Sequence, residues 1–119
     1  MSTIQKHEDL IVWQKAHKFV IEVYSLTKIF PNAEKFALAN QLNRAAVSVA
    51  SNIVEGFYRV SVNERKRFYI IARASLEEAK YQLLIAKDLN YFSFEKYQII
   101  INLSNEVGKL LNGWTKIQK

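Results

Sequence analysis

Positively charged side chains gather in one short stretch of the chain, where they could bind the phosphates of a nucleic acid. Residues 59–73 hold five lysines and arginines against one glutamate, and so carry four of the six net positive charges. Lysine and arginine bind phosphates, and a tyrosine can stack on an unpaired base. On a helix, Lys66, Tyr69, Arg73, Lys80 and Lys87 fall within about 60° of one another. The candidate nucleic-acid-binding residues are Arg59, Arg65, Lys66, Arg67, Tyr69, Arg73, Lys80 and Lys87.

The same charges could instead form a solvated helix face with local ion pairs, such as Arg73 with Glu77. No helix-turn-helix or RNA-recognition motif accompanies them. Any binding is therefore expected to depend on phosphates and to tolerate changes of base sequence.

A second set of polar residues has the spacing of one helical stripe. Gln41, Arg44, Ser48, Asn52 and Glu55 fall within about 80° on a helical wheel, and short amides and hydroxyls in that register predict a polar seam against a partner helix that carries Ser75 and Glu78. If the chain reverses near residue 61, Arg44 lies opposite Glu78, Ser48 near Ser75, and Glu55 near Arg67. We expect the seam to fix the register of the helices; a binding role and chance spacing are the alternatives. The predicted seam consists of Gln41, Arg44, Ser48, Asn52, Glu55, Ser75 and Glu78.

Patterns of catalysis and metal binding are missing from the sequence. The chain has no cysteine, and no glutamate is followed three residues later by the histidine that di-iron bundles use. His7 and His17 lack metal-ligand spacing, and the carboxylates of Glu77 and Glu78 would point about 100° apart on a helix. We therefore predict a protein that is not an enzyme and has no metal or cofactor.

Four segments with helical periodicity must position these residues. They cover residues 9–29, 33–57, 61–89 and 93–117, and the chain has one proline and three glycines in 119 residues. Short connections make sequential helices antiparallel. The predicted fold is all-α, an antiparallel up-down-up-down four-helix bundle, with residues 9–119 as a single domain and residues 1–8 as a flexible tail.

Polar residues at the segment boundaries predict where the helices begin. Asn32 is a candidate N-cap of the second helix, Ser61 and Glu64 have the spacing of a capping box, and Ser93 precedes the fourth helix. The apolar runs are far shorter than the roughly 20 residues that cross a membrane, and residues 1–9 lack the apolar stretch of a signal peptide. We predict a cytoplasmic protein with no membrane partner.

The seam residues also carry a family resemblance. The pattern is Phe30-Pro31-x-x-Glu34, Arg44-Ala45-Ala46-x-Ser48, Asn52-Ile53-x-Glu55-Gly56 and Ser75-Leu76-x-Glu78. It resembles the bacterial four helix bundle protein family, which was first noticed in intervening sequences of 23S ribosomal RNA genes, and the resemblance covers about residues 9–112. It implies an up-down bundle that forms ring-shaped homopentamers. It also implies a relation to the accessory variability proteins of diversity-generating retroelements, which bind nucleic acid and a reverse transcriptase.

The basic residues together with the resemblance predict a homo-oligomer that binds structured RNA or DNA. The resemblance implies that the oligomer is a pentamer, with ribosomal RNA as one candidate ligand and a reverse transcriptase as a candidate protein partner. The alternative is an oligomeric adaptor or assembly protein without nucleic-acid contact. Several apolar residues off the core faces favour an oligomer in either case. They are Leu10, Ile21, Ile70, Tyr81, Leu84, Phe94 and Ile101.

Overall fold

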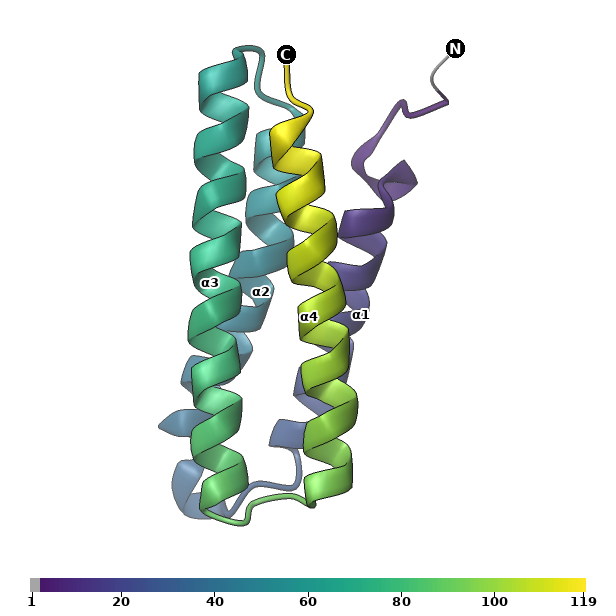
Figure 1. Ribbon diagram of the computed structural model, residues 1–119. Helices are drawn as coiled ribbons and strands as arrows, with labels where there is room; N and C mark the ends of the chain where they lie inside the picture. Colours follow the sequence, from purple (N-terminus) through teal and green to yellow (C-terminus); the bar gives the residue numbers. More distant parts are fainter. Residues whose placement is uncertain (1–2) are drawn as a thin grey trace.

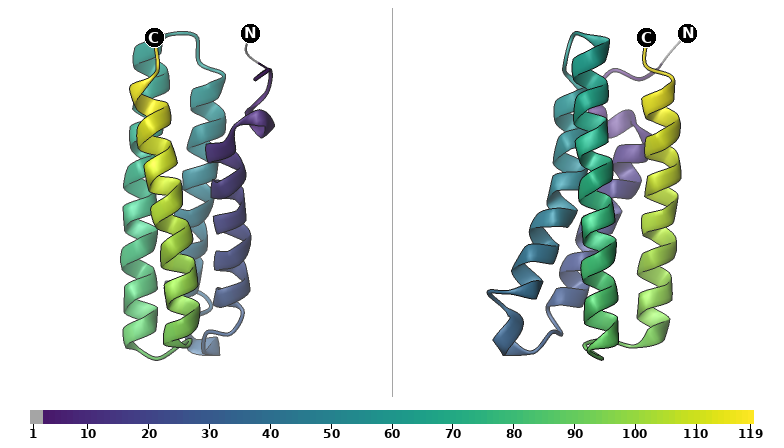
Figure 2. Two further views of the ribbon diagram at one scale, coloured as in Figure 1. Left: turned by 45° about the vertical axis from the view of Figure 1, so that its right-hand side comes forward. Right: turned by 60° about the vertical axis from the view of Figure 1, so that its left-hand side comes forward.

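Four long helices form the fold. The computed structural model describes residues 3–119. The helices are α1 (Ile11–Thr27), α2 (Leu38–Phe57), α3 (Val62–Asp88) and α4 (Phe94–Lys116), with 3-10 turns η1 (His7–Asp9) and η2 (Asn32–Glu34). Figures 1 and 2 show that sequential helices run in opposite directions. The α2–α3 connection lies at the same end as the start of α1 and the end of α4, and we call this the upper end. The predicted all-α four-helix bundle is confirmed.

The helices occupy the four corners of an elongated bundle of 47 × 24 × 19 Å. α1 packs on α2 and α4, while α3 packs on α2 and α4, and the α2–α3 pair is the most extensive. Apolar residues at helical spacing converge on the axis, and each fully buried leucine, isoleucine or phenylalanine contributes about 1.5–3 kcal/mol. The largest fully buried side chains include Phe19, Leu42, Ile53, Tyr69, Leu76, Leu83, Ile100 and Leu111.

Hydroxyl caps begin α3 and α4 as predicted. Ser61 Oγ accepts a hydrogen bond from the Glu64 N–H at 3.0 Å, and Ser93 Oγ accepts one from the Lys96 N–H at 3.2 Å. α3 ends where Asn90 adopts the left-handed conformation with a φ of 62°. Asparagine tolerates this conformation, and it allows the Tyr91 N–H to reach the Ala86 carbonyl at 2.9 Å.

The α1–α2 connection differs from the prediction. α2 begins at Leu38 rather than near residue 33, and Asn32 lies inside η2 instead of capping α2. Contacts with the α3–α4 connection hold this segment out of the helix: the Tyr91 hydroxyl donates to Glu34 Oε2 at 2.6 Å, and the Phe30 ring stacks on Phe92. That hydrogen bond, together with burial, raises the pKa of Tyr91.

The expected tail, residues 1–8, lies partly against the bundle. Residues 1–2 fall outside the described part. Asp9 Oδ2 accepts hydrogen bonds from the Gln5 and Lys6 N–H groups, which lower the pKa of Asp9. The backbone N–H of His7 donates to the Tyr58 hydroxyl at 3.3 Å, so η1 is attached to the end of α2.

The apolar residues expected on the surface divide into two groups. Ile21, Ile70, Tyr81 and Phe94 are exposed, as predicted. The prediction was wrong for Leu10, which is 2% exposed because η1 turns it into the core, and Leu84 and Ile101 are half-buried. Within residues 3–119, no helix combines the length and apolar character that crossing a membrane requires.

Candidate nucleic-acid interface

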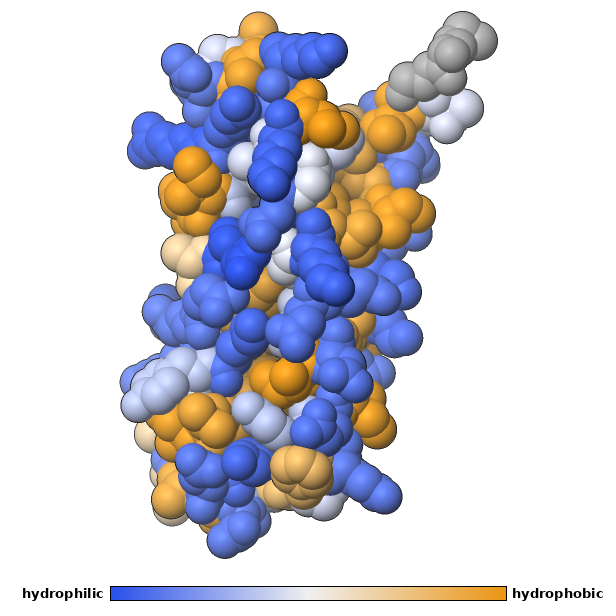
Figure 3. Space-filling model, viewed as in Figure 1, coloured by the Kyte–Doolittle hydropathy of each residue, from blue (hydrophilic) through white to orange (hydrophobic). Residues whose placement is uncertain are grey.

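The positive residues lie along α3 and on the connection before it. Arg59 precedes α3, Arg65, Lys66 and Arg67 lie in its first two turns, and Arg73, Lys80 and Lys87 follow toward the lower end. Figure 3 shows a run of hydrophilic side chains down the face formed by α3 and α4, with hydrophobic patches on either side. The structure therefore distributes the charges around the start of α3 and along its length, and their contacts decide which of them can meet a ligand.

Tyr69 does not belong to this surface. Its side chain is fully buried, with the ring against Gly56 and 6.4 Å from the ring of Trp114. Burial raises the pKa of the phenol, opposed by the neighbouring Trp114 N–H and the charge of Arg65. The prediction that Tyr69 stacks on a base was wrong, because α4 covers the side of α3 on which it lies.

Arg65 acts as a clamp within the protein. Its guanidinium donates to the carbonyls of Val60 at 2.6 Å and Arg59 at 3.2 Å, to Gln118 Oε1 at 3.0 Å, and to the main-chain oxygen of Lys119 at 2.8 Å. These bonds join the α2–α3 connection to the end of the chain after α4. A phosphate could reach the guanidinium only by displacing them, so Arg65 is a structural residue that still contributes positive charge at the upper end.

We expect Arg65→Ala to lower the free energy of unfolding by about 1–2 kcal/mol, because a charged donor and its fixed geometry are lost. Arg65→Lys should recover little of this loss, since a lysine ammonium lacks the planar fork. Thermal melts followed by circular dichroism measure the effect, and Lys66→Ala is the matched neighbour. Equal melting temperatures for Arg65→Ala and Lys66→Ala would contradict the clamp.

Ion pairs involve the positive residues farther along α3, Arg73, Lys80 and Lys87. Glu77 Oε2 lies 3.2 Å from Arg73 Nε and 3.6 Å from Lys80 Nζ, and Lys87 Nζ lies 3.0 Å from Asp88. Arg73 also donates to the Gly108 carbonyl. These three cations are half-buried and partly neutralised, as expected for a solvated face with local pairs.

The upper end holds the positive residues without acidic partners. Among the described residues, Arg59, Lys66 and Arg67 make no ion pair. The Arg59 guanidinium lies 4.7 Å from the centre of the Phe68 ring, which fixes its position by a cation–π contact. Tyr58, 56% exposed, is an aromatic side chain next to Arg59 that sequence reasoning missed. Its place in the break between two helices, where side chains point outward, is the signal that could have found it.

The inner half of the predicted seam is confirmed. Ser48 Oγ and Ser75 Oγ are 2.8 Å apart, and Asn52 Nδ2 donates to the Ser48 carbonyl at 2.8 Å and to Ser48 Oγ at 3.0 Å. These short polar side chains join α2 to α3 at mid-height.

The outer half of the seam differs from the prediction. Gln41, Arg44, Glu55 and Glu78 are exposed, and no ion pair joins Arg44 to Glu78 or Glu55 to Arg67 in the described chain. These longer side chains sit beyond the line of contact between the helices and extend into solvent. Loss of Arg44 or Glu78 therefore leaves no buried charge unpaired within one subunit.

The two histidines lie at the start of α1 around one tryptophan. The His17 ring stacks on Trp13 at 5.0 Å, and the His7 ring meets Trp13 edge-on at 4.9 Å. His7 Nδ1 is also 3.0 Å from the Tyr58 hydroxyl. Within residues 3–119, no three side chains of histidine, aspartate or glutamate come together where they could hold a metal ion. These contacts give the histidines a packing role.

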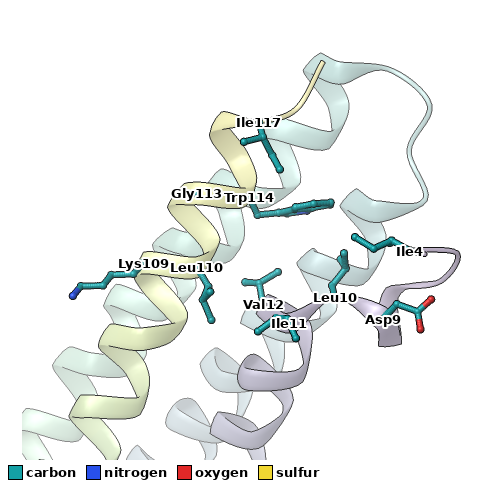
Figure 4. A pocket seen from close by; sticks show the side chains of 10 residues that line it. All are labelled: Ile4, Asp9, Leu10, Ile11, Val12, Lys109, Leu110, Gly113, Trp114 and Ile117. Atoms are coloured by element: carbon teal, nitrogen blue, oxygen red, sulfur yellow. The ribbon is translucent and has the colours of Figure 1, made fainter. Parts of the chain in front are cut away.

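An apolar groove of about 350 Å³ separates the start of α1 from the end of α4 at the upper end. Figure 4 shows Leu10, Val12, Leu110 and Trp114 directed into it, with Lys109 pointing away. Its charged neighbours are few, so it offers no site for phosphate. The groove is a separate feature from the positive residues at the start of α3.

Comparisons with known proteins identify relatives of the whole bundle. The model of a family described as 23S rRNA-intervening sequence protein matches residues 8–113. A solved structure of a protein of unknown function from the S23 ribosomal protein family of Bacteroides thetaiotaomicron VPI-5482 is similar, with a TM-score of 0.83 and 29% sequence identity. The similarity covers 89% of this chain and 99% of that one. No curated protein matches the chain.

Proposed function

We propose that this chain, which belongs to the 23S rRNA-intervening sequence protein family, is a non-enzymatic protein of the cytoplasm that binds structured RNA or DNA through the phosphates. We further propose that it acts as a homo-oligomer, namely a ring of five copies. The observation that carries the proposal is the group of positive residues without acidic partners at the upper end. They are Arg59, Lys66 and Arg67, with Arg65 adding its charge from beneath.

Two physical effects support the proposal: electrostatic attraction to phosphates, and the repetition of the same surface in each copy of an oligomer. Each lysine or arginine that neutralises a phosphate releases a condensed counterion, so affinity falls steeply with salt. Copies of the same surface in one oligomer bind one nucleic acid together, which multiplies weak contacts. The exposed ring of Tyr58 beside Arg59 takes the stacking role once expected of Tyr69.

Filter binding of the wild-type protein to a structured RNA across a salt series tests the proposal. Lys66→Glu should weaken binding by about tenfold or more at low salt and reduce the salt slope by about 1–2. Lys15→Glu is the matched control, because Lys15 pairs with Glu106 far from the α2–α3 connection. Absence of binding at low salt, or equal effects of the two substitutions, would overturn nucleic-acid binding.

The second candidate function is an oligomeric adaptor that contacts only proteins, for example a nucleic-acid enzyme such as a reverse transcriptase. The large exposed side chains of Ile70, Tyr81 and Phe94, each more than 60% exposed, favour protein contacts. An oligomer that binds no RNA or DNA at low salt would support this alternative.

A further inference from the structure

Two exposed ridges run along neighbouring helices. The α2 ridge consists of Arg44, Val47, Ser51 and Glu55, and the α3 ridge of Arg67, Ile70, Ala74 and Glu78; all eight are exposed. Both sets have the spacing that keeps side chains on one side of a helix. In the part of the chain that the structure describes, their four charged residues have no ion-pair partner.

The two ridges carry complementary side chains in matching order along their length. The Ser48–Ser75 hydrogen bond sets the register of the antiparallel pair. Counting from it, Arg44 lies within one residue of the level of Glu78, and Glu55 within one residue of the level of Arg67. Between the charges, Val47 and Ser51 lie within two residues, about 3 Å, of the levels of Ala74 and Ile70. Each end of the ridge pair thus carries one positive and one negative side chain. At both positions between the ends, a large side chain lies near the level of a small one.

Within one subunit the ridges cannot meet along their length. The side chains of Ser48, Asn52 and Ser75 occupy the line between the helices, and the eight ridge side chains lie exposed outside that line. A second copy of the chain in the same orientation brings an α3 ridge to the α2 ridge at equal height.

We propose that the α2 ridge of one copy packs against the α3 ridge of the next, with Arg44–Glu78 and Glu55–Arg67 ion pairs between copies. Val47 and Ile70, 38% and 62% exposed in the monomer, become buried against Ala74 and Ser51. The outer seam residues Arg44, Glu55 and Glu78 thereby gain partners. Arg67 is then paired with Glu55, so phosphate binding by the oligomer falls to Arg59 and Lys66. This inference rests on the proposed homo-oligomer and identifies its contact surface.

The contact is head-to-tail, since two different surfaces of each copy take part. Repetition turns each copy in the same sense, and such a contact either closes or forms a filament. Parallel copies joined at equal height have no rise along the axis, so the assembly closes.

Size exclusion with light scattering tests the surface by charge inversion. Arg44→Glu places a carboxylate against Glu78 of the next copy, and Glu78→Arg places two guanidinium groups together. Each variant alone should shift from the wild-type mass toward the monomer mass of 13.9 kDa. The double variant Arg44→Glu with Glu78→Arg should again form the larger species, because the inverted charges match at every contact between copies, whatever their number.

Controls separate this inference from the functional proposal. Lys15→Glu should keep the wild-type mass, and circular dichroism checks that every variant is helical. A wild-type oligomer whose mass is unchanged in both variants overturns the ridge contact and leaves the oligomer standing. A wild-type protein that is monomeric overturns the oligomer and the ridge contact together. A double variant that stays monomeric also overturns the ridge contact.

Discussion

Replacing Gly56 with alanine is expected to lower the free energy of unfolding by about 1–2 kcal/mol. A Cβ at this position would lie 2.6 Å from Tyr69 Cε1 and 3.1 Å from Phe68 Cβ. The Tyr69 ring is fully buried and cannot move aside without shifting its neighbours. Overpacking of a core typically costs about 1–3 kcal/mol, and the better helix propensity of alanine returns less than about 1 kcal/mol. Thermal melts should show a fall of several degrees.

Gly113 is the matched control for this substitution. It also lies inside a helix, but apart from its chain neighbours and the adjacent helix backbone no atom lies within 4 Å of a Cβ built there. Gly113→Ala should therefore raise stability by about 0.5–1 kcal/mol through helix propensity alone. Opposite signs for the two substitutions would establish the close approach of Tyr69 to α2. A stabilising Gly56→Ala would show that this approach is loose.

Helix periodicity predicted the four elements because their apolar faces are nearly uninterrupted. The boundary near residue 33 failed for a reason outside the segment. Its pattern is compatible with helix, but the Tyr91–Glu34 hydrogen bond and the stacking of Phe30 on Phe92 compete with the first turn. Such a contact joins two connections far apart in sequence, so no local pattern could reveal it.

The sequence allowed prediction of only those seam contacts that depend on the backbone register of α2 and α3. Ser48 and Ser75 have short side chains that stay at the line between two helices, and the predicted pairing was right. Arg44 and Glu78 are long enough to extend away from that line, and a helical wheel does not say where their ends lie. The charges were noticed correctly, but the pairing between them within one subunit was wrong.

Tyr69 shows most clearly that the sequence of one helix does not determine whether a side chain is buried or exposed. It lies between the apolar stripe of α3 and the positive residues Lys66 and Arg73, so a wheel fits either environment. The deciding facts are the absence of a Cβ at Gly56 and the approach of Trp114 from α4. Both lie on other helices. A tyrosine at the edge of an apolar stripe needs the neighbouring helices before it can be assigned to a surface.

This burial makes Tyr69→Ala the substitution with the largest expected effect. Truncating a fully buried aromatic side chain typically costs about 3–5 kcal/mol, a large part of the roughly 5–15 kcal/mol that holds a domain together. Tyr69→Phe keeps the ring and removes only a hydroxyl that makes no hydrogen bond of good geometry. It should therefore be neutral or slightly stabilising. Urea denaturation of the two variants measures both values.

The pH dependence of stability provides an independent check on the same residue. Because burial raises the pKa of Tyr69 in the folded state, its neutral form favours folding, and that contribution is complete below the ordinary pKa of 10.0 and lost as the pH rises above it. Tyr69→Phe should therefore lose less stability than wild type above pH 10.0. RNA binding by Tyr69→Phe should equal that of wild type, since the buried hydroxyl never reaches a ligand. A large loss of RNA affinity in this stable variant would return Tyr69 to the binding surface and contradict its place in the core.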